Sequence, residues 1–447
     1  MGHVLLAAPP VTRFALHQRL AKALLARGHR ATVLAGDPVS YEFHARQGLA
    51  VLPWRARGVE TTLLPLEDFA ATDLTLWGRS TTRGDAFAAR VRTLGRLASG
   101  LREVFERERP ECVFLHQERG GIHRLVHFLA REHGVPVLHT GTGLLPHTMQ
   151  WDESGLDGDS SLCRRIAYDY RDHARDEVFL AAALAAWTAG IQPFALPQDP
   201  ASPVPAARGL VALAEAWRQG LGREALHSWS AAREWHPQTA PAAPAPVQPP
   251  DGPYVVLLAQ DPRDPRLLLD APQAPAQTTL LRGVRGAASA LDPACRVVVL
   301  GAPATELPES EGVLFLPLDA APALLATALA AVTVNHPLGI GALLMGTPLL
   351  HLGRSAYGIR GVATQTALVG LEADLRAALH LDPGTLRERF LTRVLQNDHV
   401  WCSARLPDHN GVRGLVERIE MLLRVPGPYA RGRHYRPGPA WPLAVSP

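Results

Sequence analysis

Short apolar runs alternate along the chain with stretches in which apolar residues recur every three or four positions. The first run covers residues 3–8, and a stretch with helical spacing follows at residues 16–27. Gly28 stands where that stretch ends, and a second apolar run covers residues 31–35. A buried parallel strand has a continuous apolar pattern, whereas an amphipathic helix has a period of 3.6 residues. The order therefore predicts a strand–helix–strand unit and a parallel sheet.

The same alternation continues after a less regular region at residues 38–83. It predicts a helix, a strand, a helix and a strand in turn, at residues 86–108, 112–116, 122–132 and 135–139. Residues 161–235 have a largely helical pattern.

Residues 236–253 read HPQTAPAAPAPVQPPDGP and separate two such regions. Alternating proline and alanine favour an extended chain that does not pack into a core. The alternation of short strands and helices restarts at Tyr254. We therefore predict an α/β protein with two Rossmann-like, doubly wound domains facing across a cleft. The predicted parts are a first domain with a helical extension, a linker, a second domain, and a closing helix with a tail, at residues 1–235, 236–253, 254–410 and 411–447.

The composition limits which binding partners and which cellular compartment can be expected. The net charge of the 447 residues is +3, which gives no reason to expect nucleic acid as a partner. The four cysteines lie far apart and lack metal-type spacing, as is typical of a reducing cytoplasm. No apolar run reaches the roughly 18 residues that a spanning helix needs. We expect a cytoplasmic protein, with peripheral attachment at the inner membrane left open.

A polar loop follows the strand expected at residues 135–139. Gly141 and Gly143 break that strand, and Asp152, Asp157 and Asp159 follow among glycines and serines. Open α/β sheets bind ligands at the carboxyl ends of their strands, where unpaired backbone N–H groups can face a ligand. Ordinary surface turns have the same composition, so composition alone leaves both interpretations open.

Another polar segment, HQERGGIH, follows the strand expected at residues 112–116. Glu118, Arg119 and His123 could hold a sugar or a phosphate through charge-assisted hydrogen bonds. A surface ion pair between Glu118 and Arg119 is the other interpretation.

The second domain carries its own candidate site in the segment TVNHPLGIG. A strand ends near Asn335 and His336, and a helix is expected to begin near Gly339 and Gly341. The N-terminus of a helix offers N–H groups and partial positive charge to a phosphate. Tight packing of the helix on small residues would explain the glycines equally. Gln260 follows the first strand of this domain and should lie at the same edge of the sheet, as a ligand contact or as part of a proline-rich turn.

The sequence lacks the motifs that are typical of several classes of enzyme. The sequence has no HExxH pair, no GxSxG elbow and no GxxxxGK[ST] loop. We therefore expect no metal and no cofactor, and we exclude serine hydrolases and P-loop enzymes.

Four segments resemble the bacterial capsule polysaccharide biosynthesis family, whose transferases add Kdo sugars to the lipid end of capsule chains. They are HVLLAAPP with RLAKALLARGHRATVLAGD, GLLPHTMQWDESGLDGDSSL, YVVLLAQDPRDPRLLLDAP, and AAVTVNHPLGIGALLMGTPLLHLGRSAYGIRG. The chain departs from the family at three places. Gly141-Thr142 stands where the family has an acidic pair, Leu300–Pro303 keeps only the proline of a Lys-Pro-His-Pro-like segment, and Gly341 replaces a frequent glutamate.

The resemblance implies a glycosyltransferase that acts in capsule or related surface-polysaccharide assembly. The donor would be a nucleotide sugar, with CMP-Kdo as the first expectation, and the acceptor a lipid-linked or growing glycan. Capsule assembly or export proteins would be further partners. A transferase-like scaffold or glycan-binding subunit without catalysis is the alternative, and a sugar-phosphate epimerase has the same two-domain plan.

The resemblance also distributes roles over the candidate residues. The expected nucleotide-binding residues are Gln260, Asn335, His336, Gly339 and Gly341. The expected acceptor-binding residues are Glu118, Arg119, His123, Gly143 and His147. The catalytic carboxylate would be Asp152 first, then Asp157 or Asp159, because the transition state of glycosyl transfer carries positive charge on the sugar.

Overall fold

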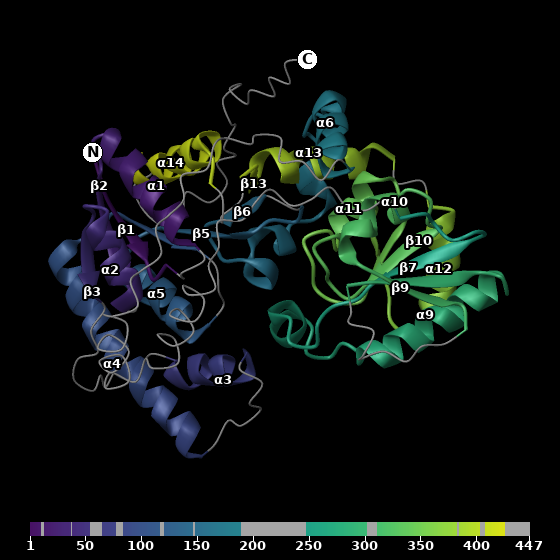
Figure 1. Ribbon diagram of the computed structural model, residues 1–447, viewed down its shortest axis with the longest axis horizontal. Helices are drawn as coiled ribbons and strands as arrows, with labels where there is room; N and C mark the ends of the chain where they lie inside the picture. The colour runs from purple at the N-terminus through teal and green to yellow at the C-terminus, as the bar shows by residue number, and fades with distance from the viewer. Residues whose placement is uncertain are drawn as a thin grey trace.

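The computed structural model describes most of the chain as two α/β domains that lie side by side (Figure 1). The described residues are 1–9, 13–36, 38–53, 65–76, 84–116, 120–145, 148–188, 247–301, 311–381, 384–402 and 407–424. Most of the expected linker, the end of the helical extension and the tail lie outside them. Among the described helices, none combines the length and the apolar character that crossing a bilayer requires.

The first domain is built on a seven-stranded sheet with the order β13-β6-β5-β4-β1-β2-β3. Five of these strands are parallel neighbours: β1 (His3–Ala7), β2 (Arg30–Ala35), β3 (Ala50–Pro53), β4 (Cys112–His116) and β5 (Val137–Thr142). β1 lies between β4 and β2, so the strand order reverses there, as in other doubly wound sheets.

Helices cover both faces of this sheet because side chains alternate along each buried strand. Val4 and Leu6 face α1 (Phe14–Ala26) and α14 (His409–Arg424). Leu5 and Ala7 face the other layer. That layer contains α3 (Leu66–Leu76), α4 (Asp85–Glu108) and α5 (Gly121–Glu132). A further helix, α2 (Pro38–Arg46), precedes β3.

The predicted break after His139 is wrong. β5 continues through Gly141 to Thr142 and forms an antiparallel hairpin with β6 (Met149–Asp152). Gly141 pairs with Gln150 across the hairpin, and the Gly143 N–H donates to the Thr148 carbonyl at 2.9 Å. These amides are therefore used within the sheet and do not face a ligand.

The second domain has a six-stranded parallel sheet with the order β12-β11-β10-β7-β8-β9. Its strands are β7 (Tyr254–Leu258), β8 (Arg296–Leu300), β9 (Val313–Leu316), β10 (Ala330–Thr333), β11 (Leu349–His351) and β12 (Thr364–Gln365). α9 (Gln277–Leu291) and α12 (Leu371–Leu379) pack on one face. The other face meets α6 (Glu177–Thr188), α10 (Ala321–Leu325), α11 (Gly339–Leu344) and α13 (Gly384–Asn397). The expected fold class of two doubly wound domains is confirmed, whereas a cleft between them stays a prediction.

The chain crosses between the domains at places that the sequence analysis did not predict. α6 follows the first sheet in sequence, yet Phe179 and Trp187 are buried in the core of the second domain. After α13, β13 (His399–Val400) pairs antiparallel with β6 and adds a strand to the first sheet. α14 then packs beside α1, as Figure 1 shows in yellow and purple. The end of the described chain thus belongs to the first domain.

Candidate functional site

Asp152, the first-choice catalytic carboxylate, is buried at the end of β6 with 5% of its surface exposed. Its Oδ2 accepts hydrogen bonds from the Ser160 hydroxyl and from the N–H and hydroxyl of Ser161, at 2.7–2.8 Å. Its Oδ1 accepts the Ser154 N–H at 2.7 Å. Burial raises the pKa of Asp152, and these hydrogen bonds oppose that rise. Asp152 therefore holds the loop in shape and has no oxygen turned toward a substrate.

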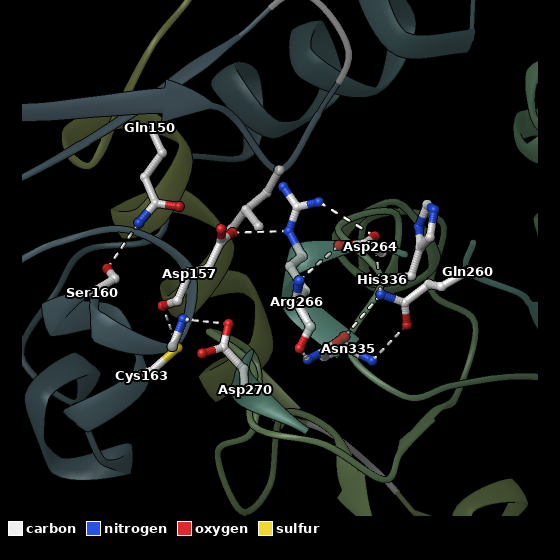
Figure 2. A network of polar contacts seen from close by, with 12 residues as sticks. Gln150, Asp157, Ser160, Cys163, Gln260, Asp264, Arg266, Asp270, Asn335 and His336 are labelled. Carbon is white, nitrogen blue, oxygen red and sulfur yellow. Dashed lines mark hydrogen bonds and ion pairs between the residues drawn. The ribbon is translucent and has the colours of Figure 1, made fainter. Parts of the chain in front are cut away.

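Asp157 joins the loop to the second domain. Its Oδ1 accepts from Arg266 Nε at 2.8 Å (Figure 2). The next N–H, from Gly158, donates to Asp270 Oδ2 at 3.1 Å. A Cβ at Gly158 would lie 2.1 Å from Asp270 Oδ1, so only glycine allows this approach. Asp157 itself has φ of +49°, a left-handed conformation that aspartate tolerates better than most residues.

Asp159 is the most exposed of the three aspartates, with 53% of its side chain accessible. Arg124 of α5 lies 4.0 Å from its Oδ2. The side chain therefore turns toward the first domain, while Asp157, two positions earlier, contacts the second.

Gln260 and Asn335, which were predicted to bind the nucleotide, lie at the carboxyl ends of the neighbouring strands β7 and β10. Gln260 Nε2 donates to Asn335 Oδ1 at 2.8 Å, and the Asn335 N–H donates to Gln260 Oε1 at 3.1 Å. Asn335 Nδ2 also donates to the Arg266 carbonyl at 3.0 Å. Figure 2 shows how these bonds tie the segment that carries Arg266 to the edge of the sheet.

His336 is a neutral hydrogen-bonding group beside Arg266. Burial and the Arg266 charge lower the pKa of His336 to about 3. Its Nδ1 accepts the Leu338 N–H at 3.1 Å, so the ring proton lies on Nε2. His336 can therefore donate a hydrogen bond without carrying charge.

Gly339 and Gly341 have packing roles instead of the predicted contact with a phosphate. A Cβ at Gly339 would lie 2.6 Å from the Tyr357 ring, and a Cβ at Gly341 would lie 2.5 Å from the Trp187 ring. The Gly339 N–H already donates to the His336 carbonyl at 3.0 Å. The structure thus selects the packing interpretation that the sequence left open.

The structure describes only some of the residues that were predicted to bind the acceptor. Glu118, Arg119 and His147 lie outside the described residues. His123 is buried in the first turn of α5, with 8% exposed. Gly143 lies in the β5–β6 hairpin, where a Cβ would come within 2.0 Å of Thr148 Oγ1, so it too serves packing.

Sequence reasoning missed Arg266 and Asp270. Both stand in π-helix η6 (Arg266–Asp270), inside the quoted segment QDPRDPRLLLDAP. An arginine between two aspartates at a strand end was the available signal, but the prolines made the segment resemble an ordinary turn.

Sequence reasoning also missed a group of buried histidines in the first domain: His17, His44 and His116. The ring of His17 lies 6.4 Å from that of His44 and 6.3 Å from that of His116. Burial lowers the pKa of His17 to about 4 and that of His44 to about 3, and the pKa of His116 also falls well below its usual value. Within the described chain, both ring nitrogens of His44 lack a hydrogen-bond partner, as do Nε2 of His17 and of His116. No signal at the sequence level marked these residues, because they come from separate elements.

Among the residues that the structure describes, no three histidine, cysteine, aspartate or glutamate side chains are grouped so that they could hold a metal ion.

Comparisons with known proteins bear on the second domain in particular. Residues 294–382 match the family described as capsule polysaccharide biosynthesis protein. No curated protein sequence matches the chain.

Solved glycosyltransferases have a distant structural similarity. The beta Kdo 2,4 transferase KpsC of Thermosulfurimonas dismutans is 14% identical, with a TM-score of 0.39 over 70% of this chain and 87% of that one. The spinosyn rhamnosyltransferase SpnG is also 14% identical, with a TM-score of 0.37 over 94% of this chain and 100% of that one. The two sheets described above establish the architecture. Over residues 294–382, which include Asn335 and His336, the chain is similar to the capsule polysaccharide biosynthesis family, and this confirms the resemblance found in its sequence.

Proposed function

We propose that the protein is a glycosyltransferase of capsule or related surface-polysaccharide assembly. It would transfer a Kdo-like sugar from a nucleotide donor, first of all CMP, to a lipid-linked or growing glycan. The main observation is that the polar edge of the second sheet meets the acidic loop of the first domain through Arg266 and Asp157, 2.8 Å apart. A transferase needs this arrangement because donor and acceptor must come together at one place.

The second domain is the proposed donor side. Gln260, Asn335 and His336 lie at the carboxyl edge of β7 and β10, where open α/β sheets bind nucleotides. Two of these three residues fall within the segment that matches the capsule family. The ring N–H of His336 would bind the base, ribose or phosphate, and the amide of Gln260 would hold Asn335 and the sheet edge in place.

The first domain is the proposed acceptor side, with Asp159 as the catalytic carboxylate. Asp152 is fully used inside the loop, and Asp157 is paired with Arg266. Asp159 keeps an accessible carboxylate on the same loop, facing α5. It would remove the proton from the acceptor hydroxyl as that oxygen attacks the sugar, while the nucleotide leaves with the bonding electrons.

Transfer from CMP-Kdo to a lipid-linked acceptor tests this proposal. We expect turnover by the wild type and at least about a 100-fold lower kcat for Asp159→Asn, because a general base is lost. Asp172→Asn is the matched control, since the Asp172 side chain is 85% exposed and pairs with its neighbour Arg171. An Asp159→Asn enzyme as active as this control would remove Asp159 from catalysis.

The same assay identifies the donor nucleotide and distinguishes a transferase from the scaffold and from the epimerase. Parallel reactions with UDP- and GDP-sugars identify another nucleotide, should CMP-Kdo fail. A wild type that binds a nucleotide but transfers no sugar from any of them would favour the non-catalytic scaffold. Conversion of a UDP-sugar without any acceptor would favour the epimerase.

A further inference from the structure

We propose that Arg266 binds the anionic group of the donor through its two terminal nitrogens, and that Asp157 orients it from the opposite domain. This inference deepens the proposed function, on which it rests. The shared chemistry is an oxyanion, which is either the phosphate of the nucleotide or the carboxylate of an acidic sugar.

The two ion pairs of Arg266 leave its terminal nitrogens without a hydrogen bond to a carboxylate, because Asp157 is bonded to Nε and Asp264 lies at ion-pair distance only (Figure 2). Asp157 engages Arg266 only through Nε, at 2.8 Å. Asp264 Oδ2 lies 3.7 Å from Nη1, which is within ion-pair distance but beyond hydrogen-bond distance. In the part of the chain that the structure describes, no hydrogen bond from either terminal nitrogen is found. A planar guanidinium presents these two nitrogens as a fork that fits phosphate or carboxylate.

A purely structural arginine in the same protein is bound differently. Arg165 directs both terminal nitrogens at Asp398, at 2.6 and 2.9 Å, and so joins the two halves of the chain with its whole fork. Arg266 has a comparable exposure of 22%, yet among the described residues neither of its terminal nitrogens forms such a hydrogen bond, and only Nη1 comes within ion-pair distance of a carboxylate, at 3.7 Å. Because two carboxylates stand near Arg266, an incoming anion meets a cation that is already held in place.

The backbone of Arg266 is fixed as a binding site requires. Its N–H donates to Asp264 Oδ1 at 2.8 Å, and its carbonyl accepts from Asn335 Nδ2 at 3.0 Å. Asn335 is in turn bonded to Gln260. The arginine is therefore positioned by the same residues that form the proposed nucleotide site, and little conformational entropy remains to be lost on binding.

His336 supplies a second donor beside this cation. Both side chains belong to the polar network at the edge of the second sheet (Figure 2), and the Arg266 charge contributes to the low pKa of His336. Since Nδ1 of His336 accepts from Leu338, its Nε2 carries the proton. One cationic fork and one neutral N–H would thus bind the oxyanion.

Calorimetric titration of the full-length protein with CMP, cytidine and free Kdo tests the role of Arg266. We expect Arg266→Gln to weaken CMP or Kdo binding about 10- to 100-fold, the loss typical of a charged hydrogen bond, and to leave cytidine binding unchanged. Loss of CMP binding alone identifies the phosphate as the ligand, and loss of Kdo binding alone identifies the sugar carboxylate. Arg266→Lys keeps the charge without the planar fork. It should bind the anion with an affinity between those of the wild type and Arg266→Gln.

Asp157→Asn tests the orienting role. We expect it to weaken binding of the same anion to a smaller extent than Arg266→Gln, with cytidine again unaffected. Arg263→Gln, at a site 78% exposed and paired with Asp261, is the control that should bind as the wild type does. Thermal midpoints of all variants separate lost binding from lost folding.

Two outcomes are distinguishable. A wild type that binds none of CMP, UDP or GDP defeats the proposed function, and inorganic phosphate then decides the role of Arg266. Phosphate binding that Arg266→Gln abolishes supports the anion site. Equal affinities of Arg266→Gln and the wild type for CMP, Kdo and phosphate would overturn the role proposed for Arg266. A wild type that binds none of these three ligands would overturn it as well.

Discussion

Asp152→Ala is expected to lower the free energy of unfolding by about 3 kcal/mol or more, and to reduce the thermal midpoint accordingly. The reason is that the carboxylate accepts hydrogen bonds from Ser154, Ser160 and Ser161 inside the loop. Their removal leaves buried donors without acceptors, which costs more than a lost surface interaction. Thermal unfolding followed by circular dichroism measures the change.

Asp172→Ala is the control for this experiment, because Asp172 is 85% exposed. Equal midpoints for the two variants would show that Asp152 does not stabilise the loop. A midpoint that stays at the wild-type value in Asp152→Ala, together with lost transfer activity, would return Asp152 to the list of catalytic residues.

The second large effect is a loss of stability of the first domain as the pH falls below 6.5. Burial lowers the pKa of His17 to about 4 and that of His44 to about 3. Between pH 6.5 and these values the unfolded chain binds protons that the folded chain does not, so acid favours unfolding. His17 alone should contribute on the order of 3 kcal/mol once the pH reaches about 4, and above pH 6.5 the penalty is absent.

Thermal midpoints measured from pH 8 to pH 4 check this expectation. His44→Phe should reduce the acid sensitivity, because Phe14 and Phe43 already surround the His44 ring at 5.0–5.1 Å and can accept another aromatic side chain. His380→Phe, at an exposed position, should leave the pH dependence unchanged. Midpoints that do not fall between pH 6.5 and pH 5 would contradict the proposed burial of neutral histidines.

Local pattern was enough to predict most strands and helices. β1, α1 and β2 follow from apolar runs and helical spacing, and the observed bounds differ from the predicted ones by a few residues. Long-range pairing could not be predicted in this way. β13 has only two residues, His399 and Val400, and becomes a strand because β6 offers an open edge.

In the candidate site, too, local pattern predicted the position of some residues, whereas only packing distinguishes the others. Gln260, Asn335 and His336 were predicted to lie together because each follows a strand of a parallel sheet, and strand ends share one edge. The three aspartates, by contrast, are alike in sequence, and only packing separates buried Asp152 from paired Asp157 and exposed Asp159. Gly339 and Gly341 show the same limit, since small residues fit a phosphate and a neighbouring aromatic ring equally well.

The return of the chain to the first sheet restricts how the two domains can move. The backbone passes from one domain to the other after β6 and comes back between α13 and β13, and the Arg165–Asp398 pair joins these two passages. In the part of the chain that the structure describes, these two connections lie at one place and would act as a pivot for rotation of one domain against the other. Asp157 and Arg266 join the loop to the second domain, so a spectroscopic distance label near those two residues would report rotation that separates them.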